Sequence, residues 1–149
     1  FTVEFWVYFN KVNNGTYTYL WNAGRSGENK QAGYQKDDNV WMTLKGNGQS
    51  VNNGFTSSTF QAGQWYHVAH TRQSIDFQGV SRFFVNGVQT LPGGAQDNEA
   101  YGSKYVFGND IYRNPGIGLQ GYMEGIRITH GVARYVDDFT PPTEPFPSS

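Results

Sequence analysis

The fold of this chain is indicated first by the stretch Gly121-Tyr-Met-Glu-Gly-Ile-Arg-Ile-Thr129. Its apolar residues Met123, Ile126 and Ile128 are typical of the buried side of a strand. Their spacing changes from three to two, and a strict period of two cannot put all of them on one face. One extra residue at Gly125, a β-bulge, would restore the alternation. The stretch therefore predicts a long closing strand with a bulge at Gly125.

The residues after this strand predict an extended exit segment. Gly131 ends the strand, and four prolines follow between residues 141 and 147. Because proline has no backbone N–H, this segment cannot continue a β-ladder. We expect the folded domain to occupy residues 1–140 and the Pro-rich exit segment to occupy residues 141–149.

Composition favours an all-β chain with one domain. Of the 149 residues, 17% are aromatic, 15% are charged and 19 are glycine. Aromatic and β-branched residues favour strands, and glycine favours the tight turns between them. We predict an antiparallel β-sandwich of two sheets, in which no helix of ordinary length occurs.

Charge and cysteine content exclude several classes of function. The net charge is −1, from 11 basic and 12 acidic side chains, and the sequence contains no basic run. We therefore expect neither nucleic-acid binding nor binding to an anionic membrane. No apolar stretch reaches the roughly 18 to 20 residues of a membrane-spanning helix, so we expect no membrane insertion. Without cysteine, the chain has no disulfide, thiolate nucleophile or cysteine-zinc site.

Alternating apolar residues predict strands along most of the chain. In residues 1–9, the odd-numbered side chains should face the core and Trp6 and Tyr8 the opposite side. Asn86-Gly87 has the composition of a two-residue hairpin turn. Loops are expected at residues 73–80 and 92–103. Further strands are expected at residues 17–23, 31–35, 40–45, 49–55, 65–72, 81–85, 88–91 and 105–107.

Three stretches resemble the laminin-G-like, or concanavalin A-like, jelly-roll domains, in a form that recurs in bacteriophage structural and bacterial surface proteins. The closing strand with Phe139-Thr-Pro-Pro-Thr-Glu-Pro-Phe-Pro147 is similar to the family's last strand and tail. Phe1-Thr-Val-Glu-Phe-Trp-Val-Tyr-Phe9 resembles its early strand. Trp65-Tyr-His-Val-Ala-His-Thr-Arg72 and Arg82-Phe-Phe-Val-Asn-Gly-Val88 resemble its central pair. Together these stretches cover about half of the chain, in the family's order.

The resemblance implies a jelly-roll fold, and it also implies residues upstream. Family members usually carry one or two further strands before the stretch that begins here at Phe1. We therefore expect roughly 20 to 30 more domain residues in the full polypeptide. Function follows less directly from the resemblance, because this fold carries lectins, adhesion modules, structural decorations and glycosidases.

A glycosidase activity is not favoured by the acidic residues. The glucanases of this fold use Glu-x-Asp-x-x-Glu on one strand, which places a nucleophile and an acid on one face. Glu4 and Glu124 could pair across a groove, but Glu124 is better explained as a residue that ties down the bulge by hydrogen bonds. A Gly-x-Ser-x-Gly elbow is also absent, and we predict that the chain is not an enzyme. The glucanase motif Glu-x-Asp-x-x-Glu begins at none of the five glutamates, Glu4, Glu28, Glu99, Glu124 and Glu144.

Two groups of residues are possible metal ligands: a pair of histidines on one strand and the Asp and Asn residues of two loops. His67 and His70 are three apart on a strand, so they point to opposite faces and cannot share a metal ion. The resemblance implies calcium at a loop rim, where Asn109 and Asp110 would supply oxygen ligands. Asp37-Asp38-Asn39 is a second candidate, and an ordinary solvated acidic loop is favoured over both.

Sugar binding needs exposed aromatic faces beside polar groups, because rings cover the apolar face of a pyranose. Trp21 and Trp41 are expected in the core, and Trp6 and Trp65 even more so. The loop-borne candidates for a glycan site are Tyr34, Asn39, Tyr101, Tyr112 and Arg113.

Two arginines near the closing strand have a structural interpretation. We expect Arg127 and Arg134 to bridge loop carbonyls or a carboxylate such as that of Asp137 or Asp138.

The sequence leaves three functional hypotheses. The first is a non-catalytic glycan-binding or adhesion module on a phage virion, as a tail fibre, spike or capsid-surface domain, or on another extracellular protein. Its partners would be a cell-surface or extracellular glycan and neighbouring protein chains. The second is a structural decoration domain of the virion that contacts neighbouring chains without a sugar. The third, a glycoside hydrolase, is disfavoured by the missing acidic motif.

Overall fold

The structure is a computed structural model that describes residues 1–12, 18–23, 34–36, 39–46, 49–54, 60–75, 78–90, 95–97, 105–109, 118–144 and 146. All regular structure in these residues is β-strand, and every strand pair is antiparallel. The predicted all-β class is thus confirmed. The same residues contain no helix that is long and apolar enough to cross a bilayer.

The larger sheet contains six strands in the order β10-β8-β7-β1-β12, with β9 paired to β8. Residues 73–80 differ from the expected loop, because β7 and β8 continue their ladder as far as the pair Ile75 and Gln78. A short strand also lies within the loop expected at 92–103. The strands are β1 (Thr2–Phe9), β7 (Trp65–Ile75), β8 (Gln78–Val85), β9 (Val88–Gln89), β10 (Ala95–Asp97) and β12 (Gly121–Thr129).

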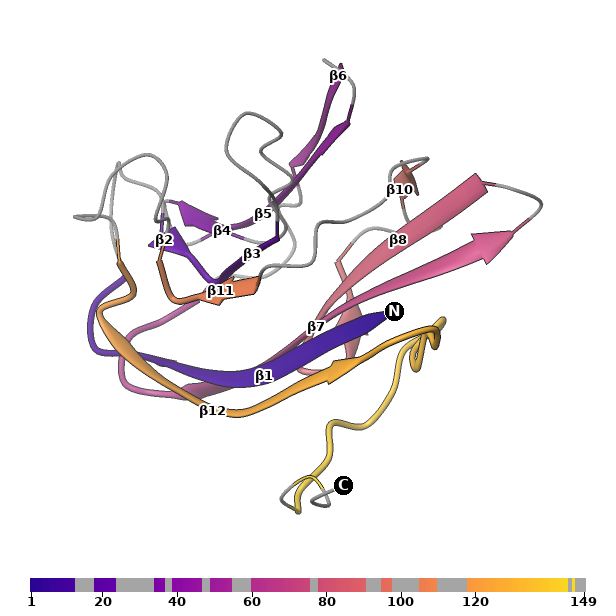
Figure 1. The fold of residues 1–149 in the computed structure, drawn as a ribbon. Helices are drawn as coiled ribbons and strands as arrows, with labels where there is room; N and C mark the ends of the chain where they lie inside the picture. The colour runs from indigo at the N-terminus through magenta and orange to yellow at the C-terminus, as the bar shows by residue number, and fades with distance from the viewer. Residues whose placement is uncertain are drawn as a thin grey trace.

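Two smaller sheets form the second layer, on the inner side of the bend of the larger sheet (Figure 1). The strand expected at residues 17–23 is divided at Leu20, so that its halves enter different sheets. One sheet pairs β3 (Trp21–Ala23) with β11 (Tyr105–Phe107). The other contains β2 (Thr18–Tyr19), β4 (Tyr34–Lys36), β5 (Asn39–Gly46) and β6 (Gln49–Gly54).

The core lies between β1 and the β3–β11 pair. As predicted, Val3, Phe5, Val7 and Phe9 all turn inward and are fully buried. The Phe5 ring packs edge-on against Phe107 of β11, with 5.9 Å between the ring centroids. Each such side chain contributes about 1.5–3 kcal/mol through the apolar surface that it removes from water. This alternation fixes which side chains of β1 are left for the outer face of the sheet.

The closing strand carries the predicted bulge. Glu4 pairs with Arg127 and Trp6 pairs with Glu124, so two residues of β12, Gly125 and its neighbour, oppose Phe5 alone. Gly125 has a φ of 57°, which a residue without a side chain adopts at little cost.

The bulge aligns two of the three apolar residues of β12 with the core. Met123 and Ile128 pack against it, as predicted. Ile126 does not, because it lies in the bulge of a strand at the end of the sheet order and keeps 46% of its surface exposed.

Residues 130–144 and Phe146 form an extended segment, called here the strap, that follows β12 across the outer face of the larger sheet (Figure 1). Side chains of the sheet hold its backbone: the Thr2 hydroxyl donates to the Val132 carbonyl at 2.9 Å, and Thr71 donates to the Tyr135 carbonyl at 2.7 Å. The Pro-rich end of the chain therefore begins on the surface of the domain.

The predicted Asn86-Gly87 turn is confirmed and anchors the middle of the strap. Both residues have positive φ, 50° and 80°, as a two-residue hairpin turn of type I′ requires. The Phe139 N–H donates to the Gly87 carbonyl at 2.9 Å. A Cβ atom on Gly87 would lie 1.8 Å from the Phe139 carbonyl oxygen, so the close approach of the strap requires glycine here.

Candidate functional site

The outer face of the larger sheet carries aromatic side chains that the core does not use. The register pairs Trp6 with His67 and Tyr8 with Trp65 across β1 and β7. The rings of Tyr8 and Trp65 lie 5.4 Å apart, and Tyr8 lies 6.0 Å from Tyr122 of β12. These residues form an aromatic surface on the face opposite the core.

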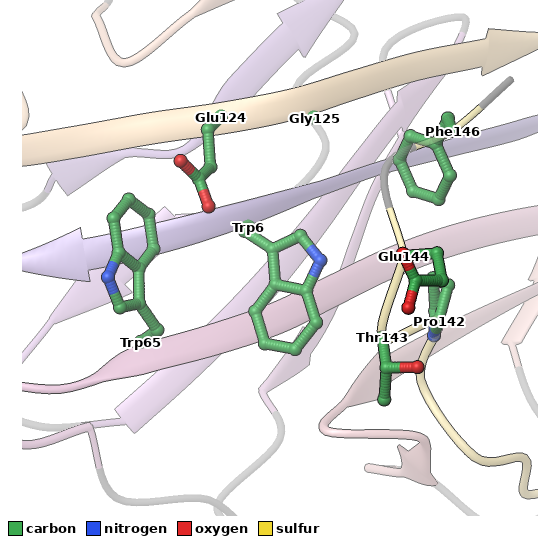
Figure 2. Close-up of a pocket in the computed structure, with 8 residues that line it drawn as sticks. All are labelled: Trp6, Trp65, Glu124, Gly125, Pro142, Thr143, Glu144 and Phe146. Carbon is green, nitrogen blue, oxygen red and sulfur yellow. The ribbon is translucent and has the colours of Figure 1, made fainter.

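A pocket of about 580 Å³ opens on this surface where the strap ends. Its walls come from both sides: the sheet contributes its aromatic residues and the bulge, and the strap contributes the opposite wall. Figure 2 shows the two tryptophans in a row along the strands, with Phe146 beyond Trp6. The lining residues are Trp6, Trp65, Glu124, Gly125, Pro142, Thr143, Glu144 and Phe146.

Trp65 corrects the sequence interpretation. It was expected in the core, but 39% of its surface is exposed, and Trp6 is only half-buried. The parity of β1 contained the necessary signal, because Trp6 occupies an even position in a strand whose odd positions form the core. Trp65 follows from the same reasoning only once its pairing with Tyr8 is known. Trp21, in contrast, is fully buried as predicted.

Two acidic side chains complete the pocket. Glu124 and Glu144 are both exposed. The Glu124 carboxylate lies between the indoles of Trp6 and Trp65 and does not fold back on the bulge (Figure 2). The bulge relies instead on the left-handed conformation of Gly125, which lies between the rings of Trp6 and Phe146.

A buried charge network fixes the strap beside the pocket. Glu4 is fully buried on the outer side of β1. Its carboxylate accepts hydrogen bonds from Arg127 Nε and from the Tyr135 hydroxyl, each at 2.8 Å. Arg127 Nη2 lies 2.7 Å from the same carboxylate, and His67 Nε2 lies 3.3 Å from it, at ion-pair distance but without hydrogen-bond alignment. Such networks are stable when every charge has partners.

The network shifts two pKa values. Burial raises the pKa of Glu4, but its contacts with His67, Tyr135 and Arg127 outweigh burial and hold it below its usual range. Burial, reinforced by the Glu4 carboxylate, raises the pKa of Tyr135 to about 12. Glu4 is therefore an ionised group whose carboxylate is fully buried and held by partners within the fold.

Aromatic contacts join the strap to this network. Tyr135 and Phe139 of the strap stack with 3.5 Å between their centroids, and Phe84 of β8 packs edge-on against both. The Arg127 guanidinium lies 3.8 Å from the centre of the Phe146 ring. The wall of the pocket is thus held by an ion pair and by ring contacts at the same time.

A match to a family model identifies the superfamily of this chain, and a solved structure has the same fold. The sequence matches the model of the concanavalin A-like lectin/glucanases superfamily over residues 1–133. The chain belongs to this superfamily. A heptameric SAP-like pentraxin from Limulus polyphemus has a similar structure, with a TM-score of 0.57 and 17% sequence identity. The match covers 85% of this chain and 61% of the pentraxin chain, less than two thirds of its length. No curated protein matches the sequence significantly.

Of the residues predicted to bind a glycan, the described part of this concanavalin A-like domain contains two, on neighbouring paired strands. Tyr34 and Asn39 lie in β4 and β5, where the structure describes only the backbone. Tyr101, Tyr112 and Arg113 lie outside the described residues. Their role in binding stays a prediction.

The calcium prediction is open for the same reason. Asn109 lies half-buried in the turn after β11, but Asp110, Asp37 and Asp38 are outside the described residues. Within the described ranges, no three His, Cys, Asp or Glu side chains are arranged to hold a metal ion. His67 and His70 lie on opposite faces, as predicted: His67 contacts Trp6 and Phe139, and His70 contacts Trp21.

The arginines of this concanavalin A-like domain have structural roles, as expected, but with different partners. Arg127 pairs with Glu4 and not with Asp137 or Asp138. Arg134 donates from Nε to the Thr129 hydroxyl at 2.8 Å.

Asp138 anchors the strap to the sheet. Its carboxylate accepts the Gln89 N–H at 2.8 Å, which ties the strap to β9.

Proposed function

We propose that this chain is a non-catalytic glycan-binding or adhesion module and that the outer-face pocket is its binding site. One observation carries the proposal: two partly exposed indoles, a phenyl ring and two exposed carboxylates line one pocket of about 580 Å³. Small-molecule sites in proteins have volumes of about 300–1,000 Å³ and combine apolar walls with a few polar groups. The pocket has this size and this chemistry.

The chemistry of the lining suits a pyranose ring. Indole faces such as those of Trp6 and Trp65 stack on the C–H face of a sugar and remove apolar surface from water. The Glu124 carboxylate between them can accept hydrogen bonds from hydroxyl groups at the ring edge. Tyr8 and Tyr122 lie on the same face of the sheet but do not line the pocket.

A binding role is favoured over hydrolysis by the state of the carboxylates. Retaining and inverting glycosidases need two carboxyl groups that both reach the glycosidic bond. Glu4 is buried and ion-paired, and the Glu-x-Asp-x-x-Glu motif does not occur in the sequence. The superfamily contains both lectins and glucanases by its description, and these residues support the lectin alternative for this chain.

We propose a virion surface or another extracellular surface as the setting, from the resemblance of the closing strand and tail to phage proteins. The alternative is a structural decoration domain whose surface contacts neighbouring chains. Exposed apolar residues favour that alternative: Tyr122 is 61% exposed, and Ile126 and Val132 are exposed nearby in the sequence. Copurification of an assembly that binds no sugar would support it.

Calcium stays part of the proposal as a rim ion held by Asn109 and Asp110. An ion that binds only the folded state stabilises it by an amount that grows with the logarithm of the ion concentration above Kd. An equal melting temperature in EDTA and in millimolar calcium would remove it from the proposal.

The direct test of the binding site is a glycan array with the wild-type chain and two single variants. Trp65→Ala removes a wall of the pocket, and Tyr122→Ala removes an exposed aromatic residue of the same face that does not line it. We expect Trp65→Ala to abolish most of the signal and Tyr122→Ala to keep most of it. Equal signals from wild type and Trp65→Ala would place the site elsewhere, and no signal from wild type would favour the structural alternative.

A further inference from the structure

We propose that the pocket prefers sugars that carry a protonated amine, that is, amino sugars with a free ammonium group. This inference rests on the proposed glycan-binding function and names the class of ligand for the same site. It is carried by the charge of the lining and by the position of one carboxylate relative to two indoles.

The lining of the pocket, as far as the structure describes it, is acidic. Two of its eight lining residues, Glu124 and Glu144, are carboxylates, and none of the eight is Lys, Arg or His. The described cation close to the pocket is Arg127, which touches the Phe146 ring but is committed to the buried Glu4 carboxylate at 2.7 Å. A ligand in the pocket therefore meets two negative charges.

The geometry suits a cation better than a neutral hydroxyl. The faces of aromatic rings carry negative electrostatic potential and attract ammonium groups, most strongly when the ring is an indole. Because Glu124 lies between Trp6 and Trp65, an ammonium group at its carboxylate would also lie against the indoles (Figure 2). A hydrogen bond between charged groups is about twice as strong as a neutral one.

The same features disfavour other sugar classes. Sialic or uronic acids would bring a third carboxylate to a pocket that already holds two, and like charges at close range repel. A neutral sugar would stack equally well on the indoles but would remove the Glu124 carboxylate from water without a counter-charge. The ammonium group of an amino sugar thus offsets the cost of removing the Glu124 carboxylate from water, which a neutral sugar leaves uncompensated.

The test compares three oligosaccharides of equal length by calorimetric titration: a β-1,4-linked glucosamine tetramer, its fully N-acetylated form and cellotetraose. The full chain is used at a mildly acidic pH, at which the amines are protonated. We expect the glucosamine tetramer to bind about tenfold more tightly than either neutral tetramer, a ratio that one charge-assisted hydrogen bond supplies. The ratio should fall as salt is added, because an exposed ion pair is screened.

Glu124→Gln is the informative variant, and Asp137→Asn is its matched control. Asp137 is an exposed acid of the strap that does not line the pocket. We expect Glu124→Gln to weaken the glucosamine tetramer about tenfold and to weaken the neutral tetramers less, so that the preference is lost. Asp137→Asn should retain the full preference.

The outcomes separate this inference from the proposed function. Equal or tighter binding of a neutral tetramer would overturn the amine preference and leave glycan binding intact. Failure of all three tetramers to bind would overturn the inference, and a glycan array without signal would overturn the proposed function as well. Binding of a trimethyllysine peptide without binding of any tetramer would also overturn the inference, because the site would then recognise a cationic protein side chain.

Discussion

The two faces of β1 are buried by different means. On the inner face, Val3, Phe5, Val7 and Phe9 pack against the second layer through apolar contacts alone. On the outer face, Thr2 and Glu4 are equally buried, but they are covered by the strap through hydrogen bonds and an ion pair. Burial of an apolar side chain needs only a complementary shape, whereas burial of a carboxylate needs a partner for every charge.

The difference also explains where the pocket lies. From Thr2 to Phe5 every residue of β1 is buried, because the strap and the second layer cover opposite faces. At Trp6 and Tyr8 the outer side chains are only half-buried, while Val7 and Phe9 stay fully buried. The pocket therefore opens at the boundary between the covered and the uncovered part of the outer face. Substitutions on one face at a time test whether the two faces of β1 are buried by these different means.

The largest expected effect comes from the inner face. Phe5→Ala leaves a cavity in the core and should lower the free energy of unfolding by about 3–5 kcal/mol. Its neighbour Trp6, which points to the outer face and is half-buried, provides the control: Trp6→Ala should cost less than half as much. Urea denaturation followed by circular dichroism measures both. Equal losses would contradict the assignment of the two residues to different faces.

The next effect comes from the buried network of the outer face. Glu4→Gln leaves Arg127 without its counter-charge and should lower the free energy of unfolding by about 3 kcal/mol. Because the folded-state pKa of Glu4 is depressed, its contribution is complete above the unfolded value and is lost as pH falls through the folded value. Urea denaturation from pH 7 to pH 3 should therefore show wild type and variant converging in acid. A constant difference across this range would contradict the ionised state of Glu4.

A smaller effect tests the contact between the strap and the hairpin turn. Gly87→Ala adds a Cβ atom 1.8 Å from the Phe139 carbonyl oxygen, whereas Gly131→Ala adds one with nothing within 4 Å. Both glycines have positive φ, so both variants lose about 1 kcal/mol from backbone strain. We expect Gly87→Ala to lose at least about 1 kcal/mol more and to expose the strap to proteolysis. Equal thermal shifts for the two variants would mean that the strap does not dock on the turn.

The smallest expected effect is a loss of folding stability in acid, caused by His70 on the inner face. Burial is the main cause that lowers the pKa of His70 to about 3, and the charge of Arg72 lowers it further. The unfolded chain therefore takes up a proton on this imidazole near pH 6.5 that the folded chain refuses, so stability falls as pH decreases below 6.5. Between pH 7 and pH 5 the loss should be about 2 kcal/mol. His70→Gln should flatten this part of the pH profile, and an unchanged slope would contradict a neutral buried His70.

Local sequence signals were sufficient for most of the strands, the bulge and the tight turn, but not for β10 or for the division of the strand expected at residues 17–23. The bulge at Gly125 followed from a change of spacing among three apolar residues, and the Asn86-Gly87 turn from its two residue types. Each of these signals lies within a few residues of the feature that it predicts. The strand ends at Ile75 and Gln78 were missed, because polar residues there pair through backbone atoms that the sequence does not distinguish.

The site was not predicted, because its parts are distant in sequence. Glu4 and Tyr135 are 131 residues apart, and no periodicity relates them. Trp65 was assigned to the core because an apolar side chain in a strand is usually buried, and only its pairing with Tyr8 places it on the outer face. The loop residues Tyr101 and Tyr112 stay predictions.

The most direct test of the central claim, that the outer-face pocket binds a glycan, is to follow the indole N–H signals of the ¹⁵N-labelled chain by NMR during an oligosaccharide titration. Trp65→Phe and Trp6→Phe variants assign the two pocket signals. The account predicts that the signals of Trp6 and Trp65 shift together with one dissociation constant, while the signal of the buried Trp21 does not move. Saturable binding that leaves both pocket signals unchanged would contradict it.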